Sequence, residues 1–313
     1  MPGLRLGILL WAQATPWGPM LEAARRIDAL GYDSLWTWDH LYAIYGDPYQ
    51  DYFEGPSVLA AWAASTNRVR LGLMVGANTF RNPGLFAKQT ATLDHLSGGR
   101  AVAGIGGAWF DLEHRAHGID FGSGFGQRLD WLDESVGLVR RILDGETVTH
   151  HGPRYDFDGV VHHPRPVQAH LPILIGGEGE RKTLRTVAKY ADMWNASSGS
   201  LDALRHKDEV LRRHCADVGR DPSTIERTVS CKLVIRDTED EARRVYRVQL
   251  EHNRCFYEEG PDVWLGTPGQ IAERLRGFRA LGFSTLIPEM PAPYDTESIE
   301  RLIGEVKPLV DAG

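Results

Sequence analysis

Residues 69–109 read VRLGLMVGANTFRNPGLFAKQTATLDHLSGGRAVAGIGGAW. The stretch predicts a strand, a loop, a helix and a second strand, with a signal at each junction. Val69–Val75 is a short apolar run that contains glycine, a pattern typical of a strand buried on both faces. Asn82 can cap the helix, and Pro83 suits its first turn, where the missing amide hydrogen would be unpaired anyway. Arg100–Ile105 then continues as the second strand.

A strand–helix–strand unit of this kind has parallel strands and a right-handed crossover. The carboxyl ends of both strands therefore open at the same edge of the sheet. The loop Gly76–Arg81 follows the first strand, and the glycine-rich Gly104–Gly107 ends the second. We expect these two segments to line one cavity, because small residues let backbone approach a ligand closely.

The same alternation of strand and helix runs through the whole chain. A helix follows each of eight predicted strands, which in 313 residues predicts an α/β protein built as a closed (β/α)8 TIM barrel. An open, doubly wound sheet remains an alternative, because counting strands does not prove closure. The predicted strands are Leu4–Leu10, Asp33–Trp38, Val69–Val75, Arg100–Ile105, Ile173–Ile175, Asp192–Ala196, Arg227–Val234 and Ser284–Ile287.

Two segments depart from this alternation. Residues 146–170 alternate aromatic or β-branched with polar residues around His151-Gly152-Pro153, which predicts a hairpin inserted before the fifth strand. We expect residues 1–313 to form a single barrel domain that carries this insertion. Leu41–Gly55 is rich in Tyr and Asp, and its length favours a functional lid over a simple connection.

Composition narrows the classes of function. With 42% hydrophobic and 25% charged residues, the chain has the balance of a soluble globular protein with a substantial core. The net charge of −7 offers no broad basic surface for nucleic acid or an anionic membrane. Three cysteines without metal-type spacing, no signal peptide and no membrane-length apolar run together favour a cytoplasmic location.

A glycine-rich junction follows the predicted strand Ile173–Ile175. Gly176–Thr183 reads GGEGERKT and opens a helix, so its backbone amides and the helix N-terminus could hold an anion. The spacing matches neither the dinucleotide nor the Walker fingerprint. A plain strand–helix turn remains an alternative, and Glu178 and Glu180 argue mildly against a phosphate unless they point away.

Asp39-His40 ends another predicted strand, where a histidine is the natural proton donor or acceptor near neutral pH. A purely structural role for His40 is the alternative. The pairs His150-His151 and His162-His163 diverge on extended chain and lack further ligands at zinc spacing, so we expect no metal site. There is also no GxSxG elbow of a serine hydrolase.

Three stretches carry a family likeness: Leu71–Pro83, Ala91–Gly107 and Leu171–Asn195. Together they resemble the bacterial luciferase-like superfamily of flavin and deazaflavin oxidoreductases, and within it the branch that uses coenzyme F420. The likeness covers nearly the whole chain. It implies a TIM barrel with the cofactor ring in the carboxyl-terminal mouth, and a homodimer.

The resemblance also implies roles for individual residues. His40 would be the acid/base residue, and Met74-Val75-Gly76 would form a bulge behind the ring, with a cis peptide bond at Met74–Val75. Gly107 and Ala108 would lie beside the ring, and Gly176 through Arg181 would bind the cofactor phosphate. The implied cofactor-binding residues are Asp39, His40, Met74, Val75, Gly76, Gly107, Ala108, Gly176, Gly177, Glu178, Gly179, Glu180 and Arg181.

The substrate side departs from part of the family. Trp109 stands where the family's sugar-phosphate dehydrogenases have an acidic catalytic residue, which makes a sugar phosphate an unsuitable substrate. An apolar or aromatic pocket is suggested instead by Trp11, Trp38, Tyr42 and Trp109.

These expectations together describe an oxidoreductase. It would transfer a hydride between coenzyme F420 and a small, apolar or aromatic organic substrate, without nucleic-acid or membrane partners. An FMN-dependent luciferase-like monooxygenase on the same scaffold is the main alternative. A non-catalytic flavin-binding protein is a third reading, which measured turnover would exclude.

Overall fold

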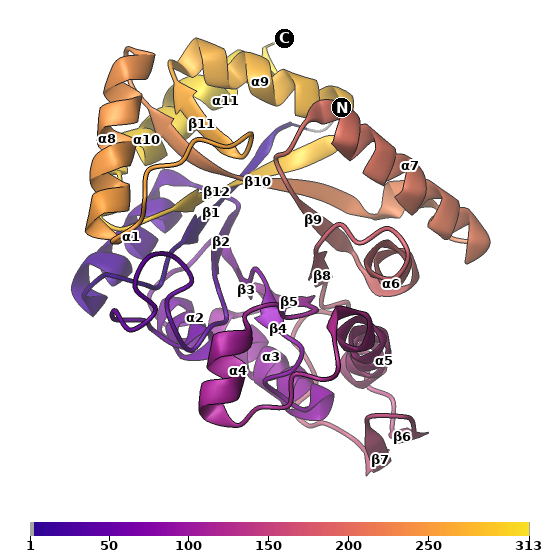
Figure 1. Ribbon diagram of the computed structural model, residues 1–313. Helices are drawn as coiled ribbons and strands as arrows, with labels where there is room; N and C mark the ends of the chain where they lie inside the picture. Colours follow the sequence, from indigo (N-terminus) through magenta and orange to yellow (C-terminus); the bar gives the residue numbers. More distant parts are fainter. Residues whose placement is uncertain (1–2, 313) are drawn as a thin grey trace.

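Eight parallel strands close into a barrel in the computed structural model, which describes residues 3–312 (Figure 1). The strands follow one another around the ring in chain order, and the last strand pairs with both the first and the seventh. The predicted barrel is therefore confirmed and the open sheet is excluded. In ring order the strands are β1 (Arg5–Leu10), β2 (Ser34–Thr37), β3 (Arg70–Leu73), β5 (Ala101–Gly106), β8 (Ile173–Gly176), β9 (Met193–Ser197), β10 (Glu226–Ile235) and β12 (Phe283–Met290).

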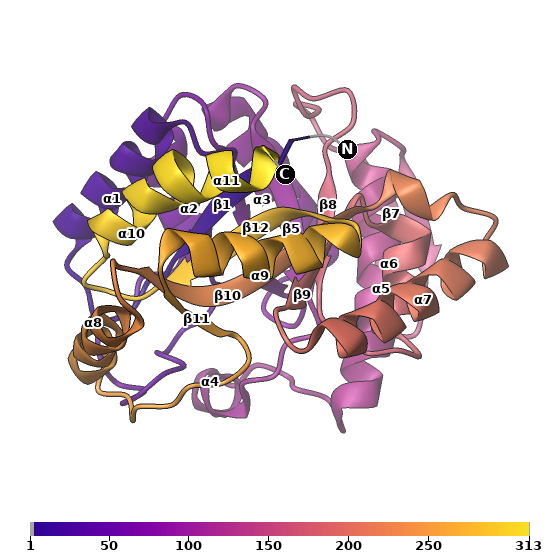
Figure 2. The same cartoon turned by 90° about the horizontal axis from the view of Figure 1, so that it is seen from above.

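Helices cover the outside of the barrel (Figure 2). The predicted cap of α3 is present, since Asn82 Oδ1 accepts a hydrogen bond of 2.8 Å from the Gly84 amide, and Gly98 ends the helix in a left-handed conformation. One wider turn, Leu302–Val306, joins the last two helices, and Pro222–Thr224 forms a short 3₁₀ turn. The covering helices are α1 (Trp17–Leu30), α2 (Gly55–Ala63), α3 (Pro83–Ser97), α5 (Phe125–Leu143), α6 (Thr183–Tyr190), α7 (Leu201–Asp217), α8 (Glu239–His252), α9 (Pro268–Ala280), α10 (Thr296–Arg301) and α11 (Lys307–Asp311).

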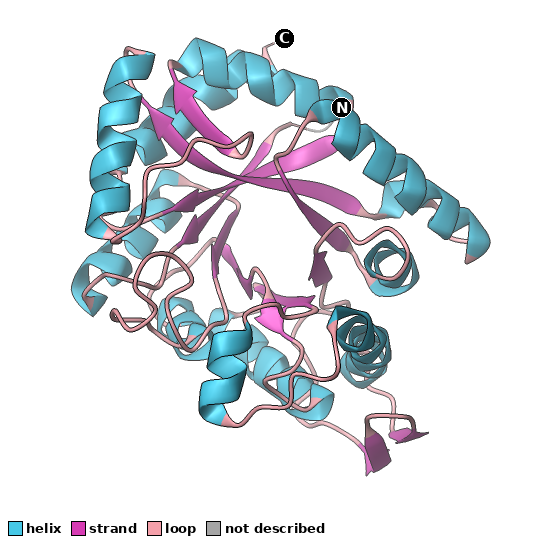
Figure 3. Cartoon of the chain, viewed as in Figure 1, coloured by secondary structure: helices cyan, strands magenta, loops and turns pink. Residues whose placement is uncertain are grey.

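The predicted hairpin insertion is also confirmed. β6 (Val148–His151) and β7 (Asp156–Val160) pair antiparallel and lie apart from the barrel (Figure 3). His150 Nε2 lies 2.8 Å from Glu134 Oε1, which ties the hairpin to α5. The insertion therefore decorates the outside of the barrel and leaves the strand ends open.

Four elements differ from what the sequence pattern predicts. The sequence after Trp109 predicts an irregular segment, but α4 (Asp111–His117) lies there; this helix is short and too charged to show an apolar period. The pattern of residues 239–259 predicts a helical region over Glu239–Glu259, but α8 ends at His252. β11 (Val263–Gly266) then pairs with β10 outside the ring. The two-residue β4 (Gly76–Ala77) pairs with β5 separately from β3. α4 lies at the end of the barrel opposite the chain termini (Figure 2).

Side chains fill the barrel interior, so it is a packed core and not a channel. A cavity lies above this layer, at the carboxyl ends of the strands. None of the helices among residues 3–312 is both long and apolar enough to cross a membrane. The buried interior cluster consists of Leu9, Trp11, Trp36, Trp38, Met74, Val102, Leu174, Met193 and Ile287.

Candidate active site

A cavity of about 430 Å³ opens at the carboxyl ends of the strands. Both predicted loops contribute to it, because Gly76 and Ala77 lie on one side and Gly106 and Gly107 on the other. The predicted site residues that line it are Trp38, Asp39, His40, Met74, Val75, Gly76, Gly107, Ala108, Trp109, Gly176 and Gly177. The lining also includes residues that had not been named as site residues: Ile44, Tyr45, Ala77, Gly106, Phe125, Asn195 and Glu289.

His40 is held by a carboxylate that sequence reasoning missed. Its Nδ1 lies 2.8 Å from Glu113 Oε1, and Glu113 Oε2 accepts a second hydrogen bond of 2.8 Å from the Leu41 amide. His40 is 8% exposed and Glu113 only 1%. Because a carboxylate can only accept, Nδ1 carries the donated proton and Nε2 is the ring nitrogen left for the cavity. The pair therefore fixes both the orientation and the tautomer of the imidazole.

Asp39 points to protein partners. Its carboxylate accepts hydrogen bonds from the Ala77 amide at 2.8 Å and from Arg81 Nη1 at 2.6 Å and Nη2 at 3.0 Å. Arg81 also pairs with Glu54 at 2.9 Å. Asp39 therefore lines the cavity from a buried position and holds the loop Gly76–Arg81 in place.

The expected bulge behind the cavity is present. The Met74–Val75 peptide bond is cis, which confirms the expectation from the family motif, and it lies between the end of β3 and the start of β4. The Val75 side chain packs against two glycines. A methyl group on Gly106 would lie 2.5 Å from it, and one on Gly176 would lie 2.8 Å from it. These glycines therefore make room for Val75 at the cavity wall.

The glycine-rich junction after β8 leaves its amides open. The Gly177 amide donates to Asn195 O at 3.1 Å, and the following amides, residues 178–181, donate to no acceptor within the described chain. Arg181 is exposed, and among residues 3–312 its side chain has no ion pair or hydrogen bond. An anion could therefore bind the amides with a cation beside it.

Glu178 and Glu180, whose negative charge is unfavourable for an anion at this junction, both bind other residues. Glu178 Oε1 accepts a hydrogen bond of 2.8 Å from the Ser197 amide. Glu180 Oε1 lies 2.6 Å from Lys207 Nζ, and this hydrogen bond lowers the pKa of Glu180. Neither carboxylate therefore blocks the amides, as a phosphate site requires.

Two of the four aromatic residues predicted for the substrate pocket line the cavity, and the other two do not. Trp38 and Trp109 line the cavity, and Trp109 is 58% exposed. Trp11, by contrast, is fully buried, and its ring stacks on Tyr45 at 4.4 Å between centroids. Tyr42 packs against Tyr49 and His117, outside the lining. Tyr45 therefore lines the cavity, whereas Trp11 and Tyr42 do not.

The loop Leu41–Gly55, for which we expect a functional lid, is hydrogen-bonded to Gln13 just after β1. Gln13 Oε1 accepts hydrogen bonds from the amides of Ile44 at 3.2 Å and Tyr45 at 3.3 Å, while its Nε2 donates to Tyr45 O at 3.0 Å. Gln13 is fully buried, and its Nε2 also donates to Asn253 Oδ1 at 3.2 Å. Through Ile44 and Tyr45, the loop forms part of the cavity wall.

The site residues that were not predicted differ in how clearly the sequence indicates them. Glu289 and Asn195 stand at or just after the ends of predicted strands, which is itself a signal in a barrel. Glu113 gave no signal, because the short helix that carries it was not predicted. No group of three His, Cys, Asp or Glu side chains suited to a metal ion occurs among the described residues.

Known proteins resemble this chain along most of its length. It is 33% identical over 163 residues to an uncharacterised protein of Mycobacterium tuberculosis, and that match spans 52% of this chain and 56% of the relative. The F420-dependent glucose-6-phosphate dehydrogenase of Kineococcus radiotolerans is 27% identical, with 98% of this chain and 97% of the relative covered. An FMNH2-dependent dimethylsulfone monooxygenase of Pseudomonas putida is 24% identical, with 73% and 71% covered.

Solved structures share the fold. An F420-dependent secondary alcohol dehydrogenase superposes with a TM-score of 0.84 at 19% identity, covering 98% of this chain and 99% of that one. The family model described as luciferase-like monooxygenase matches residues 5–285, from the first residue of β1 into β12. Since the match includes the barrel and the loops that form its cavity, the chain belongs to the luciferase-like monooxygenase family of oxidoreductases.

Proposed function

We propose that this protein transfers a hydride between coenzyme F420 and a small, apolar or aromatic organic substrate. The observation that carries the proposal is the His40–Glu113 pair, which presents Nε2 of an oriented imidazole to a cavity lined by Trp38 and Trp109. A proton donor or acceptor beside an apolar cavity is what reduction of a carbonyl, or oxidation of an alcohol, requires. The full-length likeness to an F420-dependent dehydrogenase supports the choice of cofactor.

The residues present fit a large anionic cofactor. The free amides of residues 178–181 and the unpaired Arg181 suit its phosphate, and the cavity volume of about 430 Å³ leaves room for a ring system. Gly106 and Gly176 let Val75 form a close wall behind that ring. When bound, the deazaflavin would supply or accept the hydride.

The protein's own residues would bind, orient and move the proton. His40 would exchange a proton with the substrate oxygen at Nε2, while Glu113 keeps Nδ1 protonated and the ring in place. Trp38, Trp109 and Phe125 would exclude water from the reacting groups, which strengthens the polar interactions that remain.

The cavity also argues against anionic substrates. Within residues 3–312, no lysine or arginine lines it, whereas Asp39 and Glu289 do. A phosphorylated substrate would meet no compensating charge there, in agreement with the expectation drawn from Trp109. We therefore assign the phosphate-binding junction after β8 to the cofactor alone.

An FMN-dependent monooxygenase is the second candidate. The family description and the FMNH2-dependent relative favour it, and an open amide site serves the phosphate of FMN equally well. Titration of the apoprotein with F420 and FMN side by side separates the two. We expect saturable binding of F420 in the micromolar range or tighter and binding of FMN at least tenfold weaker. Tighter binding of FMN would favour the monooxygenase, and binding of neither would contradict both.

A further inference from the structure

A second polar cluster lies in the cavity wall away from His40. Glu289 lies near the end of β12 and lines the cavity, and Lys232 lies in register with it on the neighbouring strand β10. On its other side, Glu289 is in register with Leu9 of β1, which belongs to the interior cluster. Residues in register on parallel strands point to the same face, so all three side chains point into the barrel.

The charge of Lys232 is matched by another residue. Lys232 Nζ lies 2.6 Å from Asp262 Oδ2, just before β11, and 5.4 Å from the centre of the Tyr45 ring. Burial alone would raise the pKa of Asp262, but the hydrogen bond from Lys232 holds it below its ordinary value. The pair Lys232–Asp262 therefore stays ionised and has little net charge.

Because Lys232 pairs with Asp262, the carboxyl group of Glu289 remains available to a ligand in the cavity. Burial raises its pKa, and Lys232 and the Ser230 hydroxyl only partly offset this effect. The other lining carboxylate, Asp39, is bound in two hydrogen bonds by Arg81. When Glu289 is ionised, the group of Lys232, Asp262 and Glu289 carries one net negative charge at the cavity wall.

We propose that Glu289 is a specificity-determining residue, and that it selects substrates with a basic nitrogen on an apolar body over anionic ones. The apolar body would lie against Trp38 and Tyr45, and the protonated amine would donate a charge-assisted hydrogen bond to the Glu289 carboxylate. No cation lines the described cavity to hold a carboxylate in the same place. The inference rests on the proposed function, since it names the class of substrate for that site.

Matched probes test this selection without knowledge of the natural substrate. Cyclohexylmethylamine, cyclohexylmethanol and cyclohexanecarboxylate share one apolar body and differ in the polar head. We expect the F420-loaded protein to bind the amine at least tenfold more tightly than the carboxylate at pH 7.5, measured by calorimetry. Glu289→Gln should weaken amine binding at least about tenfold, since it removes the charge that strengthens the hydrogen bond to the protonated amine.

The pH dependence of amine binding gives a second readout. The probe amine stays charged below pH 8, so its affinity should rise with pH as Glu289 ionises, and this rise should be absent in Glu289→Gln. Lys232, Asp262 and Tyr45 all face Glu289 but keep their charge state in this range, because the pKa values of Lys232 and Tyr45 are raised and that of Asp262 is lowered. His40 also borders the cavity, and it is present in both proteins.

Controls separate this inference from the proposed function. Glu251→Gln removes the same charge from an exposed position on α8 and should leave all three affinities unchanged. Glu289→Gln should bind F420 as the wild type does. Equal binding of amine and carboxylate, or an amine affinity unaffected by Glu289→Gln, would overturn the assignment of Glu289. Failure to bind F420 would instead overturn the proposed function, and the selection could still be read in the apoprotein.

Discussion

At the scale of single residues, the site depends on which nitrogen of His40 faces the cavity. Glu113 decides this, since its two oxygens bind His40 Nδ1 and the Leu41 amide at once. A histidine with one nitrogen fixed and the other free is equipped for proton transfer at a defined atom. The geometry therefore favours catalysis over support.

We expect His40→Ala to lower kcat by roughly 10²–10⁴-fold, the usual contribution of a positioned acid/base residue. The Kd for F420 should change less than threefold. His170→Ala is the matched control, because His170 precedes β8 and so lies at the other end of the barrel. Steady-state kinetics and cofactor titration measure both effects. Loss of F420 binding with kcat preserved would make His40 a cofactor-positioning residue.

Glu113 acts through His40, so its removal should affect the same step. We expect Glu113→Gln to lower kcat about tenfold or more, with little change in KM. The double variant His40→Ala/Glu113→Gln should then be no slower than His40→Ala, because residues that act as a unit are not additive. A further tenfold loss in the double variant would show that Glu113 has an independent role.

At the scale of elements, the wall behind the cavity depends on contacts between neighbouring strands. We expect Gly106→Ala to lower the free energy of unfolding by about 1–3 kcal/mol, because its methyl group would overlap the stiff Val75 side chain. Adding Val75→Ala should restore most of that loss. Gly199→Ala is the control, since nothing lies within 4 Å of its added methyl group. Urea denaturation measures all four proteins, and no rescue by Val75→Ala would contradict this explanation.

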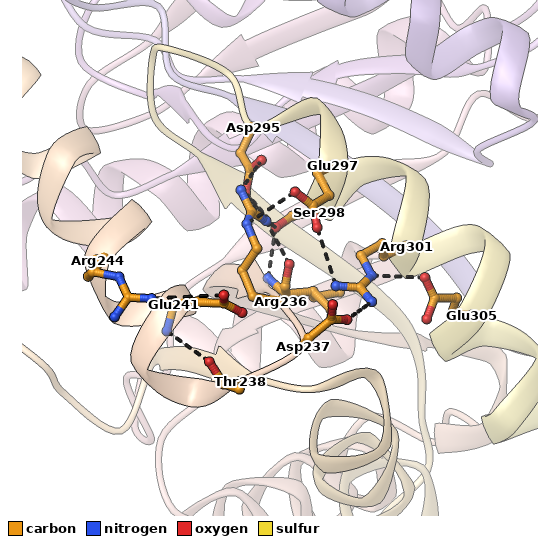
Figure 4. Close-up of polar contacts among 11 residues, drawn as sticks. Arg236, Asp237, Thr238, Glu241, Arg244, Asp295, Glu297, Ser298, Arg301 and Glu305 are labelled. Carbon is orange, nitrogen blue, oxygen red and sulfur yellow. Dashed lines mark hydrogen bonds and ion pairs between the residues drawn. The ribbon is translucent and has the colours of Figure 1, made fainter.

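An ion-pair network fixes the segment after β12 to the end of β10 (Figure 4). Arg236 binds Asp295 in two hydrogen bonds, of 2.8 and 3.0 Å, and only 14% of its side chain is exposed. We expect Arg236→Ala to lower the free energy of unfolding by about 3 kcal/mol, because it leaves a buried carboxylate unpaired. Arg244→Ala should change it by less than about 1 kcal/mol, since Arg244 is 70% exposed and its ion pair with Glu241 spans 3.9 Å. Equal effects in thermal or urea denaturation would contradict the network's role.

A buried carboxylate makes the attachment of α1 to β3 pH-dependent. Asp28 accepts hydrogen bonds of 2.8–2.9 Å from the amides of Asn67, Arg68 and Val69. Burial alone would raise the pKa of Asp28, but these hydrogen bonds hold it below its ordinary value of 3.8. Because the pKa of Asp28 is lowered in the folded state, its ionised carboxylate stabilises the fold at pH values above the unfolded-state pKa. This stabilisation is lost as the pH falls through the folded-state pKa. Asp28→Asn should therefore destabilise at pH 7 by about 1–3 kcal/mol. The difference should shrink below about pH 4, and an equal difference at both pH values would contradict this account.

At the scale of the whole molecule, the sequence was most informative where the pattern is local. All eight barrel strands, the hairpin insertion and the Asn82 cap follow from apolar runs, turn residues and capping chemistry. The residues that determine the site's details come from long-range contacts instead. Gln13 sets the path of residues 44–45, and Glu113 reaches His40 across 73 positions of sequence. Local patterns cannot encode such contacts, so the choice of Tyr45 over Tyr42 and the role of Glu113 needed the structure.

The central claim is that the junction after β8 and the cavity above the strands form one cofactor site. A crystal structure of the protein with F420 bound tests it most directly. We expect the phosphate to accept hydrogen bonds from the amides of residues 178–181, and the ring to lie between Val75 and His40 Nε2. A phosphate held elsewhere, for example by loops after β10 and β12, or a ring outside the cavity would contradict the account.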